Sequence, residues 1–274
     1  MKKLFGIFIV VGLILMLIGI SLDTSLFRTA MGNQSNNYKT INKSFASNEI
    51  EQIVIDSRNA GIRVKPSDND EISISYRENN NLKYNLTLEN EVLTLEQERR
   101  DNNIRFGLMN FNRGDKYTII LNIPKDSIDS LKVGSTNGAI LLQDVEIAMI
   151  DIRTTNAVIE IKNVVATNII NMGTTNGLIE FDNVNTGDLS ARTTNGLIEF
   201  SRLRANNIQM ETTNGLIEGN IIGNRDDYEK NMGTTNGRIR IDGQNYGNTV
   251  RGRSNLDKEL EMRTTNGNIT INFR

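Results

Sequence analysis

The sequence predicts an all-β protein, a parallel β-solenoid in which about seven short coils of chain stack along one axis. A sequence motif of the form Thr-Thr-Asn-Gly-x-Ile, which we call the repeat phrase, recurs at a nearly fixed period. Apolar residues alternate with polar ones on both sides of each copy. Self-similarity at a period of about 20 residues is typical of stacked repeats. Alternation with period two indicates short strands that bury one face.

The asparagine of each copy marks a predicted corner of the solenoid. The seven corners are Asn137, Asn156, Asn176, Asn195, Asn214, Asn236 and Asn266, at intervals of 19, 20, 19, 19, 22 and 30 residues. An isoleucine stands three places after every one of them. We expect Asn and Gly at the corner because both tolerate positive φ. Stacked coils would join the asparagine amides in a structural ladder at the strand spacing of about 4.8 Å.

An antiparallel meander is the competing fold, because Asn-Gly between alternating segments is also a strong hairpin signal. Parallel stacking places like residues on like, which explains why the same residue returns at the same phase. A meander gives no such reason. The repeat therefore favours the solenoid.

The sequence predicts that the chain has four segments. Residues 1–22 form a transmembrane helix, because Lys2 and Lys3 precede about 19 uncharged and largely apolar residues. The positive-inside rule then places the rest of the chain outside the cytoplasm; a cleaved signal peptide is the alternative. A polar linker (23–48) and an N-terminal β region that caps the solenoid (49–133) lead into the repeats (134–274).

Composition removes most catalytic chemistry. The chain contains no cysteine and no histidine, so thiol catalysis, Ser-His triads and the common zinc sites are excluded. Its formal net charge of −2 gives no basic field for nucleic acid. We therefore expect no catalytic residues, no cofactor and no metal.

One acidic feature is concentrated on the repeats. Four positions after successive corners come Glu160, Glu180, Glu199 and Glu218, which would form an outward column about one strand spacing apart. Like charges side by side are destabilising, so Arg153, Arg192, Arg240 or a bridging divalent cation would offset them. The column is a possible surface contact; a solvated, screened face is the alternative.

The repeats resemble a known bacterial family, DUF4097, whose members carry the label adhesin. The matching residues are the segment from Ile53 to Val64, the strand from Tyr117 to Pro124, and the seven corners. With the N-terminal apolar segment, the chain is most similar to membrane-anchored, LiaG-type members, found in Gram-positive bacteria near envelope-stress response genes. The resemblance implies a β-repeat domain and no catalytic residues.

These observations together predict a single-pass protein of the cell membrane with an extracytoplasmic domain. Its expected role is a non-catalytic binding or scaffold module at the cell envelope, connected with the envelope-stress response. A cell-wall polymer or another envelope protein is the expected partner. Two alternatives stay open: a polysaccharide-active enzyme with a cleft built by residues 224–230 and 243–258, and a self-assembling structural rod.

Overall fold

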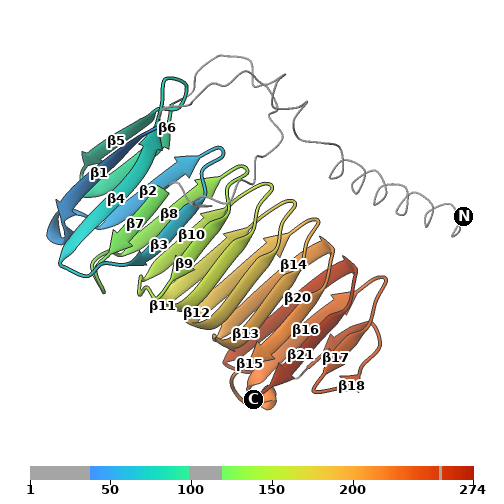
Figure 1. Cartoon of the computed structure of the whole chain (residues 1–274). Coiled ribbons are helices and arrows are strands. Elements are labelled where there is room, and N and C mark those ends of the chain that lie inside the picture. The colour runs from blue at the N-terminus through green and yellow to red at the C-terminus, as the bar shows by residue number, and fades with distance from the viewer. Residues whose placement is uncertain (1–37, 99–118, 253–254) are drawn as a thin grey trace, which may run out of the picture. The chain divides into compact units, whose positions relative to one another are not determined.

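The computed structural model describes residues 38–98, 119–252 and 255–274 (Figure 1). The chain divides into two units, Met1–Tyr38 and Lys39–Arg274. The predicted membrane span at 1–22 lies outside the described residues. In the described part of the chain, no helix has the length and apolar character needed to cross a bilayer.

Each repeat phrase joins a strand before the corner to a strand after it, and within each of these two sets neighbouring strands are parallel. These strands are β8 (Ser130–Ser135), β9 (Ile140–Gln143), β10 (Met149–Arg153), β11 (Ile159–Gly173), β12 (Ile179–Thr193), β13 (Ile198–Arg204), β14 (Asn207–Asn214), β15 (Ile217–Ile221), β16 (Tyr228–Thr234), β17 (Ile239–Ile241), β20 (Lys258–Asn266) and β21 (Ile269–Phe273). Each coil has a pre-corner strand and a post-corner strand, and the long β11 and β12 continue around the opposite bend into the next coil.

Pairing between coils is parallel and in register, as the solenoid prediction requires. Ile159 pairs with Ile179, and Ile179 pairs with Ile198. The isoleucine that follows each corner is fully buried in all seven copies, and so is Ile62. Like residues therefore stack on like along the core, which includes parallel Phe181 and Phe200 rings with centroids 5.3 Å apart. The antiparallel meander is ruled out for the repeats.

The N-terminal strands extend the same stack. They are β1 (Lys39–Ala46), β2 (Gln52–Ser57), β3 (Ile62–Pro66), β4 (Glu71–Glu78), β5 (Tyr84–Glu89), β6 (Val92–Gln97) and β7 (Ile119–Ile123), with the 3-10 turn η1 (Ser47–Glu49) between β1 and β2. β2 and β3 form a coil that pairs in parallel with β8 and β9 on one side and with β6 and β7 on the other. Parallel pairing thus crosses the predicted boundary at residue 133.

Antiparallel strands end the stack on the N-terminal side. β5 pairs with β6, β4 pairs with β7, and β1 pairs with β4. Residues 39–46 were predicted to be linker; they form β1 because Ile41 and Phe45 pack against the core and the backbone pairs with β4 along its whole length. Lys39 and Lys43 are exposed on this edge strand, a common device against edge-to-edge aggregation.

The C-terminal coils do not stack in chain order. β20 pairs with β14 on one side and β16 on the other, and β21 lies in the same way between β15 and β17. The last coil of the chain therefore fills a slot between the two coils that precede it (Figure 1). Outside β16 and β17, the short strands β19 (Thr249–Arg251) and β18 (Gln244–Asn245) pair antiparallel and cover the end. The turn η2 (Arg225–Asp227) precedes β16.

Positive φ occurs at the opposite bend and not at the Asn-Gly corners. None of the seven corner asparagines, nor the glycine after any of them, has positive φ, so the expected reason for these residues is wrong. Glycine is needed for close approach: a Cβ built on Gly196 would lie 1.8 Å from the carbonyl oxygen of Gly177 in the preceding coil. At this step the corner backbones stack too tightly for a side chain.

Candidate functional site

The corner asparagines form a continuous amide ladder on the surface. In spatial order it contains Asn59, Asn137, Asn156, Asn176, Asn195, Asn214, Asn266 and Asn236. Each Nδ2 donates to the Oδ1 of the asparagine before it, with N–O distances from 2.7 to 2.9 Å. The geometry is that of the predicted ladder, with Asn59 as an added member and the last two members exchanged.

The two threonines of each phrase point in opposite directions. The first is buried, and its hydroxyl donates to a carbonyl of the preceding coil: Thr193 to Gly177 O at 3.2 Å and Thr212 to Gly196 O at 3.0 Å. The second, such as Thr194, is exposed. The buried hydroxyls are thus satisfied by the coil they stack upon, as buried polar groups must be.

Interrupting the ladder is expected to weaken the stack measurably. Asn195→Ala removes one donated and one accepted bond, to Asn176 and from Asn214. We expect the free energy of unfolding to fall by about 1 kcal/mol, because net hydrogen bonds contribute about 0.5–1.5 kcal/mol each and these are exposed. Chemical denaturation checks this against Thr194→Ala, an exposed neighbour with no role in the ladder. Equal midpoints for the two variants would contradict a stabilising ladder.

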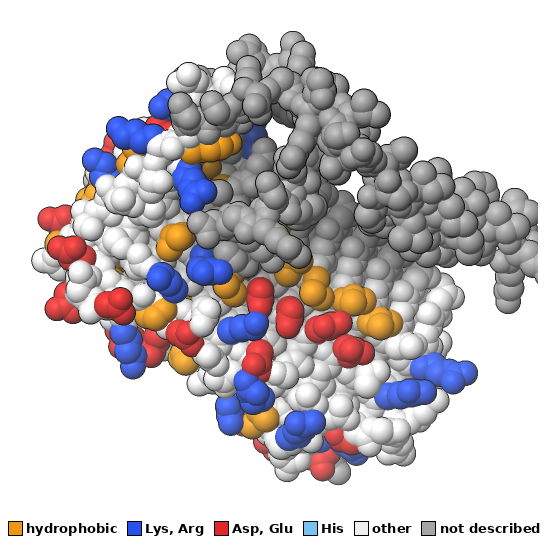
Figure 2. All heavy atoms as spheres, in the orientation of Figure 1, with side chains coloured by type: hydrophobic (Ala, Val, Ile, Leu, Met, Phe, Trp, Pro, Cys, Tyr) orange, Lys and Arg blue, Asp and Glu red, His pale blue; other side chains and the backbone are white. Residues whose placement is uncertain are grey.

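Two further columns lie beside each other where the post-corner strands begin, and we call them the apolar stripe and the glutamate column. The apolar stripe consists of half-exposed Ala139, Val158, Leu178, Leu197 and Leu216. The glutamate column consists of Glu160, Glu180, Glu199 and Glu218, aligned residue to residue across neighbouring strands. Figure 2 shows a row of apolar side chains beside a row of acidic ones along this face. Together they give the solenoid a long amphipathic surface.

Most of the glutamate column has no ion pair with a described residue. Lys162 forms an ion pair with Glu160, and the hydrogen bond and charge of Glu160, with smaller contributions from Glu180 and Asp182, raise the pKa of Lys162. Among described residues, no ion pair reaches Glu180, Glu199 or Glu218. The surface therefore presents a line of carboxylates at the strand spacing of about 4.8 Å.

The arginines expected to offset the column lie elsewhere. Arg153 pairs with Asp151 at 3.1 Å and Arg192 pairs with Glu211 at 3.7 Å, both on pre-corner strands. Each of these arginines stands three residues before its corner asparagine. Its side chain therefore lies on the face formed by the pre-corner strands, and the glutamates lie on the face formed by the post-corner strands.

Arg240 does not follow the glutamate column directly either. Glu218 is next to Thr270, and Thr270 is next to Arg240. The exchanged order of the last two coils inserts this threonine, so the arginine is about two strand spacings, roughly 10 Å, from the last glutamate.

A second ladder at the opposite bend was not predicted. Asn163 Nδ2 donates to Asp144 Oδ1 at 2.7 Å, and Asn183 Nδ2 donates to Asn163 Oδ1 at 2.9 Å. All three residues have φ between 52° and 56°, which Asn and Asp tolerate better than most residues. Each of the three stands seven places after a corner asparagine, so this second ladder could have been predicted from the repeat spacing.

The described residues contain no group of three or more carboxylates placed to hold a metal ion. The two insertions in the last repeats supply η2, β18 and β19, which cover the end of the stack. The described outer face presents hydrogen-bonding amides and hydroxyls, an apolar stripe and aligned carboxylates.

Fold and surface together define a repeat protein of stacked β-coils with a patterned outer face. The chain belongs to the family described as Toastrack DUF4097, which matches residues 50–272. A search of curated proteins finds no match.

Solved structures similar to this chain include a "putative adhesin" of Bacteroides fragilis, 13% identical over 85% of this chain and 97% of that one, with a TM-score of 0.45. A "putative lipid binding protein" of Parabacteroides distasonis is 14% identical over 87% and 98%, with a TM-score of 0.44. A "putative cell adhesion protein" of Clostridium sporogenes is 12% identical over 86% and 100%, with a TM-score of 0.37.

Proposed function

We propose that the chain is a non-catalytic binding or scaffold module of the cell envelope, connected with the envelope-stress response. Residues 1–22 would anchor it as a single-pass membrane protein, with the solenoid on the extracytoplasmic side. Lys2 and Lys3 before the apolar segment support this orientation.

The observation that carries the proposal is the amphipathic outer face. The apolar stripe and the glutamate column lie side by side on the same strands, and three of the four glutamates have no ion pair with a described residue. Aligned unpaired carboxylates repel one another, and a partner with positive charges would relieve that repulsion. An extended basic segment of an envelope protein, or an amine-bearing wall polymer, complements this surface in shape and charge.

The ends of the stack favour a binding module over a self-assembling rod. A rod would need parallel coils at both ends that can pair with another copy. Here β5 and β1 close one end and β18 and β19 close the other, all in antiparallel pairing that interrupts the repeat. Such strands protect the ends from pairing with another chain.

The proposal is tested with variants that change charge without changing shape. The double variant Glu180→Gln, Glu199→Gln is expected to bind isolated envelope fractions at least tenfold more weakly than the parent, a loss of about 1.4 kcal/mol of binding free energy or more. The matched control is Glu211→Gln, Glu259→Gln, which removes the same charge from exposed positions on pre-corner strands. Sedimentation with the envelope material at constant ionic strength measures retention.

Equal retention of the two double variants would contradict a role for the glutamate column. Release of soluble products from the envelope material by the parent chain would point to the polysaccharide-active alternative.

A further inference from the structure

Two arginines break the repeat pattern at one end of the outer face. In four successive coils the outward slots around the buried isoleucine hold an apolar residue and a glutamate, as in Leu197-Ile198-Glu199. In the coil of Asn236 the same slots hold Arg238 and Arg240, while Ile239 between them stays buried. The fold requires only the buried residue, so the arginines are not explained by packing.

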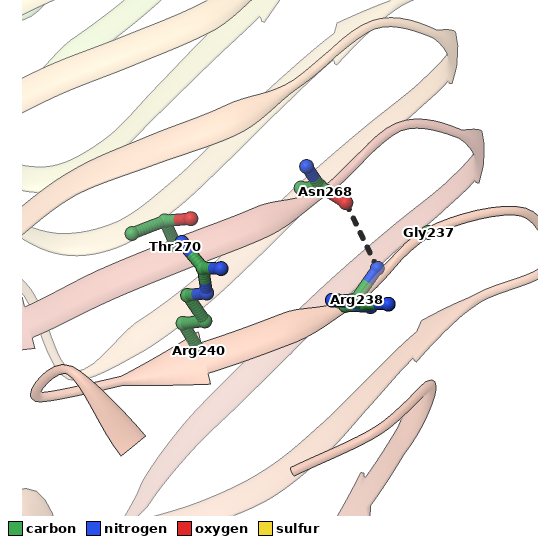
Figure 3. A pocket seen from close by; sticks show the side chains of 5 residues that line it. All are labelled: Gly237, Arg238, Arg240, Asn268 and Thr270. Atoms are coloured by element: carbon green, nitrogen blue, oxygen red, sulfur yellow. Dashed lines mark hydrogen bonds between the residues drawn. The ribbon is translucent and has the colours of Figure 1, made fainter. Parts of the chain in front are cut away.

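The neighbouring strand departs from the pattern at the same two slots. Thr270 on β21 is next to Arg240 on β17, and Asn268 and Arg238, which directly precede these strands, are next to each other. With Gly237 they line an open pocket of about 360 Å³, shown in Figure 3. The backbone N–H of Arg238 donates to Asn268 Oδ1 at 2.9 Å, which leaves the amide nitrogen of Asn268 as a further donor. Four adjacent outward side chains thus offer hydrogen-bond donors.

No described carboxylate neutralises these two arginines by an ion pair. The nearby Asp242 accepts a bond from the backbone of Phe273 at 2.8 Å and lies 3.6 Å from Arg225. The inserted coil separates Arg240 from Glu218 by one strand that carries the uncharged Thr270. The backbones of residues two apart on a strand are about 7 Å apart, so two positively charged side chains leave one short stretch of the same face.

We propose that Arg238 and Arg240, with Thr270 and Asn268, form a binding site for an oxyanion, specifically a phosphate group. Arg side chains bind phosphate through paired N–H donors. The donors come from two neighbouring segments: Figure 3 shows Arg240 beside Thr270, and the backbone of Arg238 bonded to the side chain of Asn268. A tetrahedral phosphate offers more acceptor oxygens to such an arrangement than a planar carboxylate does. The site lies apart from the glutamate column and does not depend on the function proposed for it.

Phosphate binding is tested on the full-length chain purified in detergent. Inorganic phosphate and dimethyl phosphate are titrated by calorimetry at constant ionic strength, with acetate as the carboxylate comparison. We expect saturable binding of at least one phosphate probe and a tenfold or greater loss of affinity in Arg238→Gln, Arg240→Gln. The matched control, Arg153→Gln, Arg263→Gln, removes two exposed arginines that already pair with Asp151 and Glu261 and is expected to bind as the parent does.

The two probes distinguish the sources of the phosphate. Preference for the inorganic ion supports a free phosphate ligand, and preference for the diester supports a polymer or lipid headgroup. Absence of saturation in the parent, equal loss in both double variants, or tighter binding of acetate would overturn the proposal. Glu180→Gln, Glu199→Gln is expected to leave phosphate binding intact, so failure of one proposal is separable from failure of the other.

Discussion

Deleting residues 258–274 is expected to release two coils from the stack, not one. The deleted segment contains β20 and β21, which lie between β16 and β17 and the strands of every earlier coil, so β16 and β17 pair with no earlier strand. It also buries Leu260, Met262, Ile269 and Ile271 completely. Truncation of one such side chain lowers the free energy of unfolding by about 2–5 kcal/mol. The loss of all four is therefore expected to exceed the stability of this end of a marginally stable domain.

Hydrogen exchange of the truncated chain measures this prediction directly. Amides of residues 228–251 are expected to lose protection, while amides of β8 to β13 keep it. If coils stacked in chain order, the same deletion would uncover residues 228–241 without detaching them. Unchanged protection there would therefore contradict the inserted arrangement.

Point variants keep the prediction testable if the truncated chain does not fold. Leu260→Ala lies in the inserted coil and is expected to lower protection in both β14 and β16. Val250→Ala removes a buried side chain from the outermost strand β19 and is expected to affect only that strand and β16. Confinement of both effects to the same strands would argue against the insertion.

The order of the coils could not be predicted because every copy offers equivalent residues to its neighbours. Ile217 would pair as well with Ile239 as it does with Ile269, so the repeat itself does not distinguish the two orders. The chain lengths between corners do carry information. Intervals of 19 or 20 residues reach only the adjacent coil, whereas the 30 residues from Asn236 to Asn266 allow the chain to form β18 and β19 and return. The same holds for the 78 residues from Asn59 to Asn137, which include β4 to β7.

The residues that make up each surface column could be predicted, but the ion-pair partners of the nearby arginines could not. Period-two alternation and in-register stacking place Glu160, Glu180, Glu199 and Glu218 in one line, and the structure has them there. The partners of Arg153 and Arg192 could not be predicted, because they depend on how the corner divides the two layers. The place of Arg240 depends on the coil order. Sequence periodicity thus predicts which residues align in a column, whereas the order of the coils determines which residue follows the last member of that column.

Adding one methyl group at a corner glycine is expected to destabilise the whole stack. In Gly196→Ala the new Cβ would lie 1.8 Å from the carbonyl oxygen of Gly177 and 3.0 Å from Thr193 Oγ1. Backbone atoms cannot yield as a flexible side chain can, so the corners must separate. We expect a loss of about 2–3 kcal/mol in the free energy of unfolding, as is usual for overpacking. Displacement of the corner would also break the bonds of Asn195 to Asn176 and Asn214.

Gly173→Ala is the matched control, because a Cβ at Gly173 meets no atom within 4 Å. Its φ is not positive, and alanine suits a strand interior at least as well as glycine. We expect its midpoint in chemical denaturation to equal or exceed that of the parent chain. Among the seven repeat phrases, Ala157 is the one alanine in the corner slot, which Ala60 also occupies after Asn59, and nothing in the structure explains why the step at Ala157 accepts a methyl group. Equal midpoints for Gly196→Ala and Gly173→Ala would show that the corners can separate freely, and the close approach would then not be what selects glycine there.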